Sequence, residues 1–174
     1  YKRQALIKTF YYPIDERNPE LGKNLLETRL LLKKDQGWEA VSYAWNKEQN
    51  EAFKKIAGKT INVSWTDFMG SDRDVRYRVP NVNQCKECHA TEDKITPIGP
   101  KARNINKKFD FDDGKFNQLA YWMNKQIIDD YPKELVSPVD WMDEKQNIND
   151  SVRSYLDVNC GHCHCPTGNA NSTG

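Results

Sequence analysis

Two Cys-x-x-Cys-His motifs constrain this 174-residue chain more than any other feature of its sequence. They are, in order, Cys85-Lys86-Glu87-Cys88-His89 and Cys160-Gly161-His162-Cys163-His164. The spacing places two thiols and one imidazole on a single helical turn. From average residue frequencies, one chance match in a chain of this size has odds on the order of one in a hundred to one in a thousand. Two matches therefore indicate a shared chemical role.

Covalent attachment of haem c requires this set of side chains. The two thiols form thioethers with the porphyrin vinyl groups, and the imidazole coordinates iron from the proximal side. We therefore expect two covalently bound haem c groups, each with its iron. The expected haem-binding residues are Cys85, Cys88, His89, Cys160, Cys163 and His164, with His89 and His164 as the metal ligands.

Other interpretations of the cysteines remain open. A four-cysteine zinc site would use both Cys-x-x-Cys pairs, but about 70 residues separate the pairs, whereas zinc ribbons have roughly 12 to 20. The histidine after each pair would also be unexplained. A thioredoxin-like redox pair is disfavoured because neither motif begins a helix after a parallel strand. A disulfide framework would leave Cys165 unpaired and close a strained loop.

The composition excludes some partners and suggests where the chain belongs. The 26 basic and 25 acidic residues give a net charge of +1, which argues against nucleic acid as a partner. The longest aliphatic run, Leu30–Leu32, is far too short for a transmembrane segment. The chain begins at Tyr1 without a leader, so we expect a fragment or a processed product of a longer protein.

Alternating polarity predicts that residues 1–80 are rich in β-strands. Along the clearest strand, Leu26 and Thr28 would face one side, and Glu27 and Arg29 the other. Further strands are expected over residues 41–45, 61–65 and 75–79, in one antiparallel sheet or a small sandwich. Lys47 to Ala57 is expected to form one short helix.

From Asn81 onward the period changes to about 3.6 residues, which predicts helices. One expected helix carries an apolar stripe, and a second begins at a cap at Asn149 or Asp150 and continues to Cys160. The stripe consists of Phe116, Leu119, Ala120, Met123 and Ile127.

The segment Thr96-Pro97-Ile98-Gly99-Pro100 resembles the Gly-Pro segment of class I cytochromes c. That resemblance implies that the Pro100 carbonyl accepts the N–H of the proximal imidazole, and an ordinary Pro-Gly turn is the alternative. Arg103 and Lys101 follow directly and are candidates to neutralise haem propionates, unless they are a plain solvated cluster.

The distal iron ligands are harder to assign. The order of motif, Gly-Pro segment, helix and methionine loop resembles class I cytochromes, and implies Met142 as the distal ligand of the first iron, ahead of Met123 and Met69. No methionine follows His164, so the second distal ligand is expected from a missing C-terminal part, from elsewhere in the fold, or not at all. Cys165 is either a free thiol beside that haem or an ordinary loop residue.

Longer stretches resemble a family of uncharacterised, exported bacterial diheme c-type cytochromes. The stretches with this resemblance are Val79–Cys85, Thr96–Asn104 and Tyr155–His164, together with Lys8–Pro13, Leu25–Arg29 and Gly37–Ala40. The family pattern extends beyond both ends of this chain and has Asn where this chain has Cys165. It implies an exported, haem-bearing protein and supplies no substrate.

Taken together, the sequence predicts an α+β protein. A β-rich module at 1–80 would be followed by an α-helical, class I-like cytochrome c region at 81–174 that carries both haems. The expected function is electron transfer between redox donor and acceptor proteins, in a bacterial periplasm or on the outer cell surface. The alternatives are a diheme peroxidase or oxidase with one open-coordinate haem, and a haem-bearing subunit of a larger extracellular assembly or wire, docked through the edge strands of the β module.

Overall fold

The computed structural model describes residues 4–91 and 94–173, and the chain divides into two compact units, Tyr1–Thr96 and Pro97–Gly174. The division lies later than the boundary after residue 80 that the sequence suggested, so the first Cys-x-x-Cys-His motif belongs to the same unit as the strands. Within the described part of the chain, every helix is too short or too polar to cross a bilayer.

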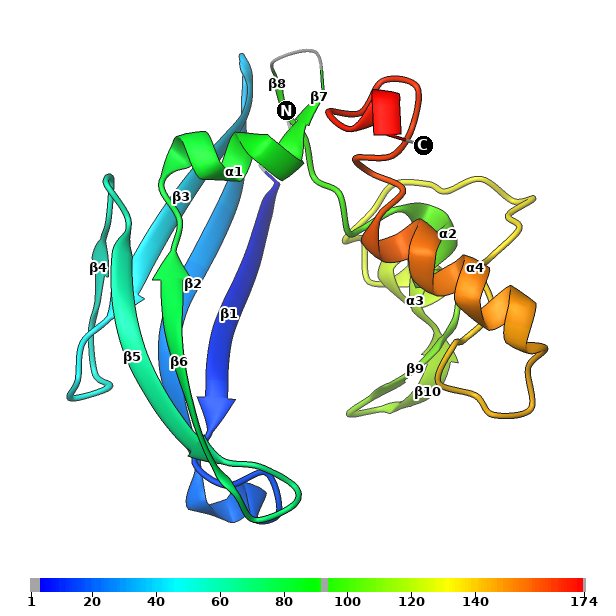
Figure 1. Ribbon diagram of the computed structural model, residues 1–174. Coiled ribbons are helices and arrows are strands. Elements are labelled where there is room, and N and C mark those ends of the chain that lie inside the picture. Colours follow the sequence, from blue (N-terminus) through cyan, green and yellow to red (C-terminus); the bar gives the residue numbers. More distant parts are fainter. Residues whose placement is uncertain (1–3, 92–93, 174) are drawn as a thin grey trace. The chain divides into compact units, whose positions relative to one another are not determined.

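The first unit is built mainly from two antiparallel sheets, which confirms the β-rich N-terminal module. The larger sheet has the strand order β1 (Ala5–Pro13), β2 (Lys23–Lys34), β3 (Gly37–Trp45) and β4 (Ala52–Lys54). The smaller sheet pairs β5 (Lys59–Thr66) with β6 (Asp72–Val79) and lies in front of the larger one in Figure 1. A short 3-10 helix, η1 (Pro19–Leu21), precedes β2. The buried apolar side chains of this unit are Leu26, Val41, Ala44, Val63 and Val79.

A bulge between β1 and β2 changes which side chains face the second sheet. Phe10 pairs with Glu27 and Tyr11 pairs with Leu25, so Leu26 is an extra residue without a partner on β1. Leu26 and its neighbour Glu27 are both buried, although strict alternation would expose one of them. At this point, therefore, the alternation does not separate a buried side chain from an exposed one.

The helix expected over Lys47–Ala57 is also wrong, because this segment turns and then forms β4. The Asn46 side chain accepts hydrogen bonds from the backbone N–H groups of Asn50 and Glu51, at 3.1 and 3.2 Å. Gln49 has a φ of 59°, in the left-handed region. An Asn side chain that bonds the following backbone competes with helix formation, and here the turn is the stable result.

The first unit ends with the helix α1 (Val82–His89) and a small hairpin of β7 (Ala90–Thr91) and β8 (Lys94–Ile95). Asn81 caps the helix in a reciprocal capping box with Gln84. The Asn81 side chain accepts the Gln84 backbone N–H, and the Gln84 side chain accepts the Asn81 backbone N–H. This box fixes the start of the helix that carries the first motif.

The second unit is not the predicted α-helical, class I-like region, and that part of the predicted fold class is wrong. Its helices are α2 (Ala102–Ile105), α3 (Gln118–Asn124) and α4 (Ile148–Asn159), of which only α4 exceeds two turns. A hairpin of β9 (Lys108–Phe111) and β10 (Gly114–Asn117) lies between α2 and α3. A short 3-10 helix, η2 (Asn171–Thr173), ends the described chain.

Local turn chemistry explains why the expected apolar helix is so short. Asp112-Asp113 form a two-residue turn before Gly114, whose φ is 131°, so Phe116 lies in a strand. At the other end Gln126 adopts a φ of 58° and terminates α3 before Ile127. Leu119 is the one buried apolar side chain among the described residues of this unit. Aromatic stacking adds to its core, with Phe111 and Tyr121 ring centroids 3.7 Å apart.

Candidate haem-attachment sites

The first motif occupies the last turn and a half of α1. Cys85 is half-buried, Cys88 is exposed and His89 is the last residue of the helix. Because the two thiols are three residues apart on one helix, they lie on neighbouring positions of the same face. Both are free thiols, as thioether formation requires.

His89 is held by Thr96 through a reciprocal pair of contacts. The backbone N–H of Thr96 donates to the His89 carbonyl at 2.6 Å, and the His89 ring atom Nδ1 lies 3.2 Å from the Thr96 carbonyl oxygen. The hairpin of β7 and β8 returns the chain so that residue 96 meets residue 89. A carbonyl has only lone pairs, so this contact is a hydrogen bond when Nδ1 carries the proton.

The Nδ1 contact decides which ring nitrogen can bind a metal. A neutral imidazole with its proton on Nδ1 carries its lone pair on Nε2, and a backbone carbonyl is a common partner that fixes this tautomer in metal-binding histidines. The resemblance to class I cytochromes implied the Pro100 carbonyl for this role. The contact in the first unit comes from Thr96, the first residue of the same Gly-Pro segment, and the role of Pro100 stays a prediction.

Cys85 lies close to a buried ionic cluster of the first unit. Burial raises the pKa of its thiol, and the charges of Arg29 and Glu27 act on it in opposite directions. Glu27 is fully buried and accepts two hydrogen bonds from Arg29, at 2.8 and 2.9 Å. Cys85 thus lies closer to the sheets, whereas Cys88, about one turn further along the same face, is exposed.

The second motif lies in the second unit, at the end of α4 and in the turn that follows. The cap of α4 is Asn147, whose side chain accepts the Asn149 N–H, rather than the expected Asn149 or Asp150. Beyond the helix, the backbone N–H groups of Cys163 and His164 both donate to the Cys160 carbonyl at 3.0 Å. These bonds close one helical turn that contains both thiols and His164.

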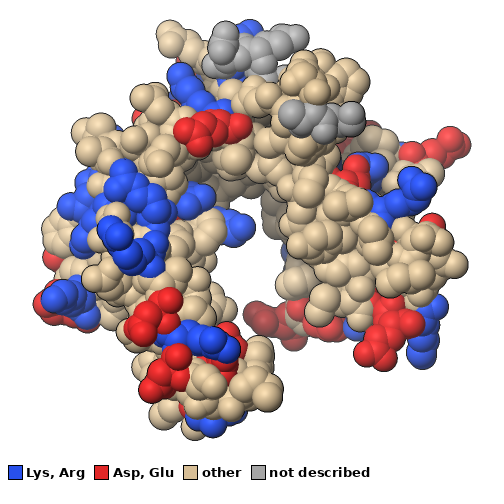
Figure 2. Space-filling view, viewed as in Figure 1, with Lys and Arg blue, Asp and Glu red and all other residues tan. Residues whose placement is uncertain are grey.

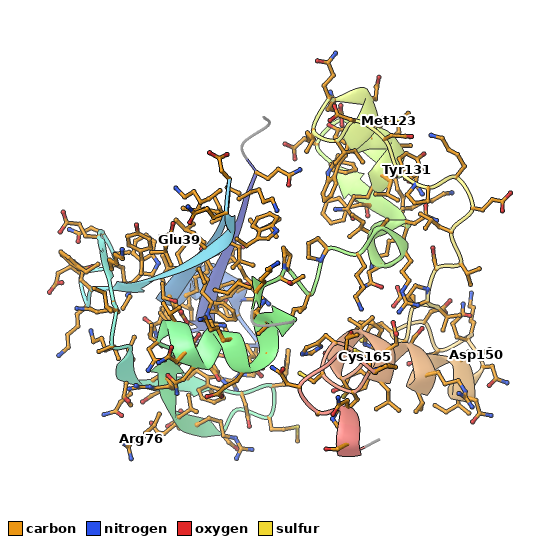
Figure 3. All side chains as sticks on the ribbon, turned by 90° about the horizontal axis from the view of Figure 1, so that it is seen from above. Glu39, Arg76, Met123, Tyr131, Asp150 and Cys165 are labelled. Atoms are coloured by element: carbon orange, nitrogen blue, oxygen red, sulfur yellow. The ribbon has the colours of Figure 1, made fainter. Side chains whose placement is uncertain are left out.

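Two glycines allow close backbone contacts around this turn. A Cβ on Gly161 would lie 2.8 Å from the Asp157 carbonyl oxygen, and one on Gly168 would lie 2.1 Å from the Cys163 carbonyl oxygen. The Ala170 N–H donates to that same Cys163 carbonyl at 3.0 Å. The segment after His164 therefore folds back against the motif. Cys165 lies in this segment, half-buried, with its Sγ 3.8 Å from the His162 carbonyl oxygen (Figure 3).

Arg103, a candidate partner for a haem propionate, forms an ion pair with a residue of α4. Its guanidinium donates to both carboxylate oxygens of Asp157, three residues before Cys160. The pair is partly exposed, with 41% of the Arg103 side chain and 35% of the Asp157 side chain accessible. Arg103 is thus tied to the helix that leads into the second motif. Sequence patterning did not indicate Asp157, since a lone acid in a helix carries no distinct signal.

All three methionines have accessible side chains. Met142, the expected distal ligand, is 78% exposed in a turn where its N–H donates to Asp140. Met69 is 86% exposed, and Met123 on α3 is 38% exposed (Figure 3). The assignment of Met142 as an iron ligand stays a prediction.

The side chains around both motifs fit a large apolar group. On α4, Val152, Tyr155 and Leu156 are about half exposed and lead toward Cys160. On α1, Val82 is 40% exposed one turn before Cys85. Exposed apolar side chains next to two thiols and a histidine would suit a porphyrin, which would cover them and gain hydrophobic stabilisation.

Comparisons with protein-family models, with curated proteins and with solved structures give no match to this chain.

Proposed function

We propose that this chain is an exported c-type cytochrome that holds two haem c groups covalently and transfers electrons between redox donor and acceptor proteins. The proposal rests on two Cys-x-x-Cys-His turns, one in each unit. The observation that carries it furthest is the contact of His89 Nδ1 with the Thr96 carbonyl. A histidine after a Cys-x-x-Cys pair, with a carbonyl that favours the proton on Nδ1 and so leaves coordination to Nε2, is the donor set that haem c needs.

The residues of the first unit have separate roles in this proposal. Cys85 and Cys88 would form the thioethers, and His89 would coordinate iron through Nε2 while the Thr96 carbonyl holds the proton on Nδ1. Cys160, Cys163 and His164 would hold the second haem. When bound, the haem supplies a one-electron Fe(III)/Fe(II) couple, whose potential depends on axial ligand, burial and hydrogen bonding. Haem c attachment takes place outside the cytoplasm, so we place the protein in a bacterial periplasm or on the outer cell surface.

The deciding experiment is expression of the chain behind a secretion signal in a bacterium that attaches haem c. The purified protein is examined by intact mass and by its alkaline pyridine spectrum. We expect two haems, one in Cys85→Ser/Cys88→Ser and one in Cys160→Ser/Cys163→Ser. Cys165→Ser is the matched control and keeps both. One zinc ion held by four cysteines, with no haem absorbance, would overturn the proposal in favour of a zinc site.

Carbon monoxide binding to the reduced protein then separates electron transfer from catalysis. If both irons are low-spin and inert to carbon monoxide, an electron carrier remains. If one iron binds carbon monoxide and turns over peroxide, the protein is a diheme enzyme instead, because substrate access needs an open coordination position.

A further inference from the structure

A groove runs along one edge of β5 in the first unit. Its volume is about 460 Å³. It is lined by residues 24–26 of β2, by Trp45 at the end of β3, by Asn46, Lys47 and Gln49 of the loop that follows, and by residues 59–64 of β5. Successive residues of a strand point to opposite faces. A groove that touches six consecutive residues of β5 must therefore follow the backbone edge of the strand and not one of its faces.

In the described part of the first unit, no strand is hydrogen-bonded to this edge of β5. On the other edge, β5 pairs with β6 along its whole length. The N–H and C=O of Thr66, the last residue of β5, point to the free edge, because they bond Ile14 and Glu16 at 3.1 and 3.0 Å. In an antiparallel pair these groups alternate between edges. Thr60, Asn62 and Ser64 therefore direct their backbone donors and acceptors into the groove.

The chain already uses this edge once. Asp15 forms an isolated parallel bridge with Thr66, and the bonds of Ile14 and Glu16 flank it. The edge is thus accessible to an extended segment at its far end. Toward Lys59 the same edge continues over the groove without such a segment among the described residues.

The charge of the groove limits what kind of segment would fit. The exposed residues Lys47 and Lys59 stand on its two sides, and none of the lining residues is Asp or Glu. Figure 2 shows Lys and Arg side chains gathered on the part of the first unit that carries β5 and β6. On that sheet Arg76 and Arg78 are also exposed, and Arg76 points away from the unit (Figure 3).

We propose that the free edge of β5 binds an extended, acidic segment of a partner protein by β-strand addition. The backbone groups of Thr60, Asn62 and Ser64 would form the ladder, and Lys47 and Lys59 would pair with carboxylates of the segment. Lysine on an edge strand can also serve to prevent pairing. Here, however, Lys47 belongs to the loop across the groove, so the two positive charges flank the space in which a strand would lie. The proposal is independent of haem attachment.

The test uses the full chain as purified, whatever its haem content, and a fluorescein-labelled eight-residue peptide in which Glu alternates with Val and Thr. Fluorescence anisotropy at low salt is expected to rise to saturation. Asn62→Pro removes an N–H that faces the groove and leaves the bonds to β6 intact, as edge strands tolerate, and should abolish binding. Lys47→Glu/Lys59→Glu should weaken binding about tenfold or more, whereas the matched control Lys34→Glu/Lys108→Glu should not change it.

Circular dichroism confirms first that each variant is folded. Binding that is equal in the parent chain and in Asn62→Pro would overturn strand addition, and equal binding in the charge-reversal variant would overturn the acidic specificity. Concentration-dependent self-association that the peptide displaces would instead assign this edge to a second copy of the chain.

Discussion

The phenol of Tyr77 donates a hydrogen bond of 2.8 Å to Glu27 Oε2 and so joins β6 of the smaller sheet to β2 of the larger one. Burial, together with the hydrogen bond to Glu27, raises the pKa of this phenol, so Tyr77 remains a neutral donor. Arg29 supplies the counter-charge and also lies 4.2 Å from the ring of Phe10. A fully buried carboxylate is tolerated here because three donors bond it and one of its partners neutralises it.

Replacing Glu27 should therefore destabilise the first unit strongly. In Glu27→Gln the Arg29 guanidinium loses its counter-charge, and we expect the free energy of unfolding to fall by about 2 to 3 kcal/mol. This is at or below the usual cost of breaking a buried ion pair, because Arg29 is partly exposed. Urea unfolding followed by tryptophan fluorescence measures it. Glu39→Gln, at an exposed position on β3, is the control and should change stability by less than about 0.5 kcal/mol. Equal stability of the two variants would show that the cluster does not hold the sheets together.

The capping box makes the start of α1 sensitive to a single change. Asn81→Ala removes the acceptor for the Gln84 N–H, and should lower the free energy of unfolding of the first unit by about 1 kcal/mol. Asn83→Ala lies inside the same helix, makes no capping contact and is the matched control. Thermal unfolding by circular dichroism compares them. If Asn83→Ala is the more damaging of the two, the box is not what fixes this helix.

The two thiols of the first motif should react at different rates in the haem-free chain. Burial raises the pKa of the Cys85 thiol. At a pH below that pKa, a smaller fraction of Cys85 is therefore thiolate than in an unperturbed cysteine, and burial also limits the access of a reagent to its sulfur. Cys88 is exposed. We expect iodoacetamide to modify Cys88 first, and the difference to shrink as the pH is raised through the pKa of Cys85. Peptide mass spectrometry over time measures both rates, and faster modification of Cys85 would contradict the orientation of α1.

Gly168 should be essential for the fold around the second motif. A methyl group there would meet the Cys163 carbonyl oxygen, a backbone atom that cannot move aside. In Gly168→Ala we expect the Ala170 amide, which bonds that carbonyl, to exchange with solvent about tenfold faster or more. Gly99→Ala is the control, because nothing lies within 4 Å of its added methyl group. Unchanged exchange at Ala170 would show that the segment does not pack as described.

The sequence identified the strands of the first unit because their apolar residues alternate, yet it missed the inward position of Glu27. Periodicity assumes one residue per step, and the bulge at Leu26 adds a residue that the pattern cannot reveal. Burial of Glu27 further depends on Tyr77, 50 residues away in the sequence. Such a pairing is a tertiary event with no local signal.

In the second unit, the helix expected from Phe116 onward was wrong for a reason that is visible in the sequence. Phe116 and Leu119 match a helical period, but Asp112-Asp113-Gly114 between alternating aromatic residues is a hairpin signal that outranks it. The two Cys-x-x-Cys-His motifs were evident from the sequence alone. The contact between His89 and Thr96 was not, because it depends on a hairpin of only two residues per strand.

The reciprocal pairing of His89 with Thr96 has a consequence for how this site tolerates mutation. Both partners of His89 in that pairing are main-chain atoms, so the acceptor at its ring persists whichever side chain occupies position 96. Point substitutions there can alter size or polarity while the ring keeps its tautomer. A change in the length or path of the hairpin would move that acceptor, so insertions and deletions there should disturb this pairing more than substitutions at position 96 do.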